Sequence, residues 1–140
     1  MTDKKTSGPG PGAGFILVKD GKTRKILALI THKGLYDLPK GALDRTDESF
    51  LHCAKRECYE ECNIKIKYSD LIKAVPAISS GKLVVFTAFT KQKPKITENP
   101  HTGILEHSGY KWVTSKDFIK NTHKYLADAI EEFEKYSFLF

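Results

Sequence analysis

The chain has 140 residues and a mass of 15.8 kDa, which fits one domain large enough to bury an apolar core. Its formal charge of +6 favours an anionic partner, such as a phosphate compound or nucleic acid, or else a lysine-rich solvated surface. No apolar run approaches the roughly 20 residues of a membrane-spanning helix, and the polar start does not resemble a secretory signal. We therefore expect no membrane partner.

The three cysteines, Cys53, Cys58 and Cys62, lie within ten residues of one another. An odd, clustered set argues against a disulfide framework, and no CxxC or histidine spacing accompanies it to suggest a zinc site. The cysteines therefore predict free thiols and a reducing, cytoplasmic location.

Residues 1–12 are rich in Gly and Pro and predict a disordered leader before a single domain over residues 13–140. The first two apolar runs of that domain, Ala13–Val18 and Ile26–Ile30, have the length of strands. A turn signal, Asp20-Gly21, lies between them, so they predict a hairpin.

A polar loop then leads to the strongest helix of the chain, Glu48–Asn63. Thr46 or Asp47 can cap its start, and Asn63 tolerates the positive φ that ends a helix. Strand-like runs, a turn and helical segments follow: Leu71–Ile78, Ser80-Gly81, Leu83–Thr90, Tyr110–Val113, a helical turn from Ser115, and Lys124–Tyr136. Strands placed before, between and after helices predict an α/β or α+β class, with a mixed sheet between helices.

Two faces of the predicted helix carry different chemistry. Leu51, Ala54, Cys58 and Cys62 step by three and four and form an apolar stripe. Glu57, Glu60 and Glu61 gather on another face, where three carboxylates repel one another. Such oxygen ligands suit Mg²⁺ or Mn²⁺, and the alternative is a solvated acidic face.

The stretch from Gly41 to Ile64 resembles the Nudix box, G-x5-E-x7-R-E-U-x-E-E-x-G-U, where U is a bulky apolar residue. The matching residues are Glu48, Arg56-Glu57, Cys58, Glu60-Glu61 and Ile64. The chain departs from the pattern twice. Gly41 lies seven residues before Glu48 instead of six, and Asn63 replaces the last glycine.

The resemblance implies the Nudix α/β/α sandwich and a metal-dependent attack of water on a phosphorus of a nucleoside diphosphate-linked substrate. It implies that Glu57, Glu60, Glu61 and backbone groups near Gly41 bind Mg²⁺ or Mn²⁺, with Glu57 and Glu60 catalytic. It also implies that Arg56 pairs with Glu48 to join the loop to the helix.

Two segments resemble the branch that contains diadenosine tetraphosphate hydrolases and RNA 5′-pyrophosphohydrolases. They are Leu38-Pro39-Lys40-Gly41 and the E-x5-W segment from Glu106 to Trp112. In this branch Glu106 would be a further metal ligand or the general base. The candidate substrate contacts are Lys40, Lys82, Phe86 (stacked on adenine), His32 and Lys33, each with the plain alternative of a solvated or core residue.

The expected function is hydrolysis of a dinucleoside polyphosphate of the diadenosine tetraphosphate type by a monomer. One alternative is an RNA 5′-end pyrophosphohydrolase or mRNA decapping enzyme. An alternative of another class is a non-catalytic Nudix module that binds a nucleotide or RNA.

Overall fold

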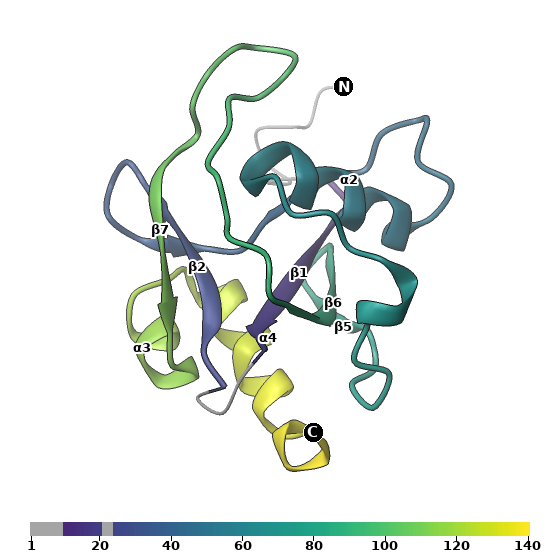
Figure 1. Ribbon diagram of the computed structural model, residues 1–140, viewed down its shortest axis with the longest axis vertical. Coiled ribbons are helices and arrows are strands. Elements are labelled where there is room, and N and C mark those ends of the chain that lie inside the picture. The colour runs from purple at the N-terminus through teal and green to yellow at the C-terminus, as the bar shows by residue number, and fades with distance from the viewer. Residues whose placement is uncertain (1–9, 21–23) are drawn as a thin grey trace.

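The fold is a mixed sheet between two helical layers, as expected (Figure 1). The computed structural model describes residues 10–20 and 24–140. Seven strands form the sheet in the order β3-β2-β1-β6-β5, with β4 paired to β1 and β7 paired to β2. Helix α2 covers one face, and α3 and α4 cover the other.

The centre of the sheet is β1 (Gly12–Lys19), which pairs in parallel with β6 (Leu83–Thr90) and antiparallel with β2 (Ile26–Thr31). All residues of β1 except Lys19 are buried, because helices cover both faces of this strand. The β1–β2 hairpin is confirmed, although Gly21 of its expected turn lies outside the described residues.

Strand β1 and its contacts include residues just before the expected domain start at residue 13. Gly12 already belongs to β1, and the carbonyl of Pro11 accepts a hydrogen bond from the Leu43 amide at 2.9 Å. Residues 1–9 of the expected leader lie outside the described residues.

Four further strands complete the sheet: β3 (Tyr36–Asp37), β4 (Lys40–Ala42), β5 (Ile78–Ser80) and β7 (His107–Val113). The strand expected over Leu71–Ile78 is wrong. A short helix, η1 (Tyr68–Asp70), precedes this stretch. Within it only the two ends pair: Leu71 forms an isolated bridge to Ala88, and Ile78 is the first residue of β5. Ile72 and Val75 bury their side chains from an irregular segment, so apolar spacing alone did not indicate a strand.

Helix α2 spans Phe50–Cys62. Its N-cap is Ser49, whose hydroxyl accepts from the His52 amide, and not Thr46 or Asp47. Asn63 ends the helix in the left-handed conformation, with φ 61°, as predicted. The remaining helices are α3 (Ser115–Lys120), α4 (Lys124–Glu134) and η2 (Ser137–Leu139).

The core has two layers, one on each face of the sheet. The α4 layer holds an apolar cluster that includes Phe118, Leu126 and Ile130, and the buried Thr87 lies on the same face. The α2 layer includes Phe15 and the three cysteines, which are buried free thiols. No helix in the described ranges has the length and apolarity needed to cross a bilayer.

Candidate functional site

Strand β4 and helix α2 come into contact at the candidate site. Gly41 pairs with Ala13 of β1, and this pairing places the Gly41 backbone directly against the Glu57 side chain. A Cβ at position 41 would lie 2.0 Å from the Glu57 carboxyl carbon. Only glycine therefore allows the loop to approach this carboxylate so closely.

Arg56 joins the loop to α2 through Asp47. Its Nε donates to Asp47 Oδ1 at 2.9 Å and its Nη2 to Asp47 Oδ2 at 2.8 Å, and Nη2 also donates to the Ala42 carbonyl at 3.1 Å. The Asp47 side chain is inaccessible to solvent. Hydrogen bonds from Arg56 hold the pKa of the Asp47 carboxyl well below its usual range.

The expected pair between Arg56 and Glu48 is therefore wrong. Glu48 is exposed, and Asp47 takes its place. Asp47 lies six residues after Gly41, the spacing that the family pattern gives to its glutamate. The extra residue thus falls after Asp47, and counting forward from Gly41 would have found the partner.

The helical carboxylates face inward from α2. Arg56 Nη1 donates to Glu57 Oε2 at 3.0 Å and to Glu60 Oε1 at 3.3 Å. Glu61 accepts from the Lys40 backbone amide at 3.1 Å. Burial raises the pKa of Glu57 and of Glu61, and neighbouring carboxylates raise both further.

Glu106 approaches this cluster from the opposite side. A cavity of about 10 Å³, the size of one water or ion, is lined by Glu57, Glu60, Glu61, Thr97, Asn99, Glu106 and His107. Asn99 Nδ2 donates to Glu106 Oε2 at 2.8 Å and orients that carboxylate. The structure thus brings all four predicted acidic residues to one cavity.

These oxygen donors suit a hard divalent cation such as Mg²⁺. Among residues 10–20 and 24–140, no three His, Cys, Asp or Glu side chains are already arranged around a common ion position. The guanidinium of Arg56 contacts Glu57 and Glu60 instead. The donor set therefore fits a metal, with side chains that must turn toward it.

Sequence reasoning missed a buried pair beneath the cavity, His107 and Asp37. His107 Nε2 lies 2.9 Å from Asp37 Oδ2, and Asp37 Oδ1 lies 3.2 Å from Lys40 Nζ. Burial alone would raise the pKa of Asp37, but the hydrogen bond to His107 and the charge of Lys40 lower it. A bulge in β7 shifts the register between His107 and Gly109, and no sequence signal indicated it.

The predicted substrate residues separate into two groups. Lys40 and Lys82 line a cavity of about 530 Å³, which also includes Gly12, Gly41, Leu83 and Tyr125. His32 reaches the site differently, with its Nε2 2.6 Å from the carbonyl of Leu105, next to Glu106. Lys33 is exposed in the same turn.

Phe86 does not join these groups. Its ring packs on Phe15, with centroids 6.1 Å apart, in the layer beneath α2. It lines neither the glutamate cavity nor the 530 Å³ cavity. This position favours the core alternative over a stack with adenine.

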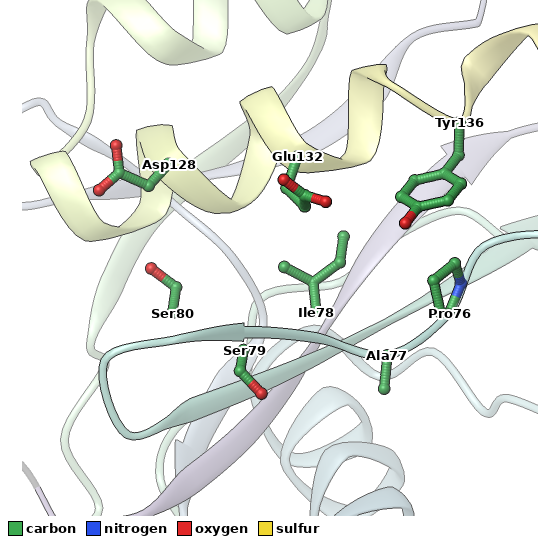
Figure 2. A pocket seen from close by; sticks show the side chains of 8 residues that line it. All are labelled: Pro76, Ala77, Ile78, Ser79, Ser80, Asp128, Glu132 and Tyr136. Atoms are coloured by element: carbon green, nitrogen blue, oxygen red, sulfur yellow. The ribbon is translucent and has the colours of Figure 1, made fainter.

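A further cavity, of about 310 Å³, lies between α4 and the β5 region (Figure 2). Asp128 and Glu132 project from α4 toward Ser80 and Ile78. These two carboxylates make it unfavourable for phosphate, in contrast to the cavity beside Lys40.

Comparison with known proteins gives a family and a fold. The family model for the NUDIX domain matches residues 8–133. No curated protein sequence matches the chain. Similar solved structures include a C. elegans Ap4A hydrolase binary complex, with 17% identity, TM-score 0.69 and coverage of 94% of this chain and 99% of that one.

Two others have a TM-score of 0.66. The MutT protein from Methanosarcina mazei Go1 is 22% identical, with 90% and 95% of the two chains covered. The NUDIX domain of Shewanella oneidensis NrtR, complexed with ADP ribose, is 20% identical, with 96% and 92% covered. At these identities the likeness shows the fold alone.

Proposed function

The chain belongs to the Nudix family, whose hydrolases act on phosphoric anhydride bonds, and from this premise we propose that it hydrolyses a dinucleoside polyphosphate. The observation that carries the proposal is the meeting of Glu57, Glu60, Glu61 and Glu106 at one ion-sized cavity. Stability alone does not require partly buried carboxylates that raise one another's pKa, whereas a bound cation offsets their repulsion.

Glu57, Glu60 and Glu61 would hold Mg²⁺ or Mn²⁺. When bound, the metal neutralises phosphate charge and lowers the pKa of the attacking water. Gly41 and Arg56 fix Glu57 and Glu60 against the loop.

Glu106 is our candidate for the general base that accepts the proton of the attacking water. It lies across the cavity from α2, and Asn99 holds one of its oxygens at 2.8 Å. His107 and Asp37 act as positioning residues, because they fix the start of β7 and the side chain of Lys40. These contacts thereby support β7 and the segment of Lys40, which lie on either side of the pair.

The 530 Å³ cavity is our candidate site for the nucleoside part of the substrate. Its size suits a small organic ligand, and two residues that line it contact the helical carboxylates: the Lys40 amide donates to Glu61, and Gly41 lies against Glu57. Lys82 at its edge can meet phosphate. The PKG form of the loop and the E-x5-W segment favour a diadenosine tetraphosphate type of substrate, which is the one named for the C. elegans structure.

We further propose a cytoplasmic monomer. The three buried free thiols fit a reducing compartment. An RNA 5′ end remains a second candidate substrate, and a lysine-rich groove described below supports it.

A hydrolysis panel tests the proposal, with Mg²⁺ or Mn²⁺ and with diadenosine tetraphosphate, 5′-triphosphate RNA, capped RNA and ADP-ribose. We expect the highest kcat/KM for diadenosine tetraphosphate and no turnover by Glu60→Gln. A faster reaction with either RNA would overturn the substrate assignment. Binding without hydrolysis of any compound would instead indicate the non-catalytic module.

A further inference from the structure

A cavity at the far end of β7 combines lysines with aromatic rings. It has a volume of about 360 Å³ and is lined by Lys19, Asp20, Thr90, Lys91, Gln92, Lys93, Tyr110 and Trp112. We propose that this lysine–aromatic groove binds a short stretch of single-stranded nucleic acid. Aromatic rings accept bases of any sequence by stacking, and lysines neutralise the backbone phosphates.

The two rings lie in a row on one face of the sheet. Tyr110 pairs with Leu29 and Trp112 with Leu27, so both point to the α2 face. Both are half-buried, which anchors them to the core while leaving part of each ring accessible. Lys19 Nζ lies 5.6 Å from the centre of the Trp112 ring, so a cation already borders the stacking surface.

The charge of the groove complements a polyanion. Lys91 pairs with Asp20 at 3.5 Å, but within the described ranges neither Lys19 nor Lys93 has a carboxylate within 4.0 Å. Gln92 exchanges two hydrogen bonds with the backbone of Lys65, at 3.1 and 2.8 Å, and these fix the lysine-bearing segment. The two exposed lysines, Lys19 and Lys93, therefore leave their charges available to phosphates.

Two segments of the chain contribute residues to both the groove and the glutamate cavity. Residues 90–99 form one wall and residues 106–112 the other, with Asn99 and Glu106 at one end and Lys93 and Trp112 at the opposite end. In Figure 1 the chain that leaves β6 rises on the far side of β2 from β7 and then turns back into β7, and residues of both segments line each cavity. From His107 to Trp112, the strand spans roughly 15 Å.

A nucleic acid with its 5′ polyphosphate at the glutamates can thus continue along this seam into the groove. That extension rests on the second candidate substrate of the proposed function, an RNA 5′ end, whose chain would occupy both cavities. Binding in the groove itself requires neither metal nor hydrolysis.

Fluorescence anisotropy tests the groove, with a 3′-labelled single-stranded adenylate oligomer that carries a 5′-hydroxyl, in the presence of EDTA. We expect the wild type to bind and the double variant Lys19→Gln/Lys93→Gln to bind more weakly. Its log Kd should depend less on log salt concentration, by about 0.7 in slope for each lysine removed. The matched control, Lys124→Gln/Lys135→Gln on and beside α4, should match the wild type.

Trp112→Leu keeps an apolar side chain against the core and should weaken binding about tenfold through the lost stack. If circular dichroism shows this variant unfolded, Tyr110→Leu gives the same measurement. Three results would overturn the proposed nucleic-acid groove. The two double lysine variants could weaken oligomer binding equally, a duplex could bind as tightly as the single-stranded oligomer, or the wild type could fail to bind. Glu60→Gln should bind the oligomer normally, so a failure of hydrolysis leaves this test intact.

Discussion

Helices cover both faces of the sheet, but the two faces differ in where their charged side chains lie. On the α4 face, the core is apolar, and the ionic pairs Lys124–Asp128 and Lys135–Glu132 lie at the exposed surface. On the α2 face, Arg56 and several carboxylates point inward, toward the loop and β7.

This difference distinguishes the exposed ion pairs of α4 from the partly buried carboxylates of the proposed site. Exposed pairs such as those of α4 contribute about 0–1 kcal/mol each. The carboxylates of the α2 face are partly buried, and burial with mutual repulsion raises the pKa of Glu57 and Glu61. Since the α4 face packs against the sheet without such a cluster, we infer that the α2 cluster serves chemistry.

The largest difference in kcat should come from replacing a glutamate by glutamine on each of the two faces. Glu60→Gln should lower kcat at least about 10²-fold, equivalent to about 3 kcal/mol of barrier, because it removes a charged ligand of the proposed metal site. Glu132→Gln on α4 should leave kcat unchanged. Steady-state kinetics at saturating Mg²⁺ measures both, and near-wild-type turnover of Glu60→Gln would remove it from the metal site.

Gly41→Ala should weaken Mg²⁺ affinity about 10–100-fold, because its Cβ must displace the Glu57 carboxylate. Gly109→Ala is the control, since a Cβ there has no atom within 4 Å. Activity measured against Mg²⁺ concentration gives the affinity. An unchanged Mg²⁺ dependence of Gly41→Ala would show that the contact between the loop and Glu57 is not needed for metal binding.

Asp47→Asn should lower the free energy of unfolding at pH 7 by about 1–3 kcal/mol, because it leaves Arg56 without its buried partner. Glu48→Gln should have no effect, because Glu48 is exposed. Urea unfolding of both variants makes this comparison. Equal stabilities of the two variants would instead favour Glu48 as the partner of Arg56, as the sequence suggested.

The Asp47 effect should also depend on pH. Arg56 lowers the folded-state pKa of Asp47, so the stabilisation is complete above the unfolded-state value of about 3.9 and is lost as pH falls below it. The stability gap between wild type and Asp47→Asn should therefore narrow below about pH 4. A gap that stays constant at lower pH would contradict the lowered pKa.

Glu106→Gln should give the smallest kinetic effect, a decrease in kcat of about tenfold with little change in KM, as for loss of a general base. Glu98→Gln, an exposed carboxylate in the same loop, is the control. The decrease should be the same for diadenosine tetraphosphate and 5′-triphosphate RNA, because the base serves the attacking water. If Glu106→Gln retains full kcat, the base lies elsewhere.

Local signals predicted much of this molecule from sequence. The β1–β2 hairpin, the end of α2 at Asn63 and the grouping of the α2 carboxylates follow from residues that are close in the sequence. The resemblance of the segment from Glu106 to Trp112 to an E-x5-W pattern then predicted that Glu106 lies opposite the helix, although the two belong to distant parts of the chain.

The remaining features depend on contacts that spacing does not encode. His107 and Asp37 are 70 residues apart and meet through a bulge in β7. The partner of Arg56 depended on where one extra loop residue falls, and only the buried Asp47 resolves it. Phe86 could face a ligand or the core, and its ring contact with Phe15 favours the core.

Calorimetric titration of Mg²⁺ or Mn²⁺ into the wild type, Glu60→Gln and Glu132→Gln tests the assignment of the α2 face most directly. We expect the wild type and Glu132→Gln to bind the metal equally and Glu60→Gln to bind at least about tenfold more weakly. Equal binding by all three proteins would contradict a metal site at the α2 carboxylates.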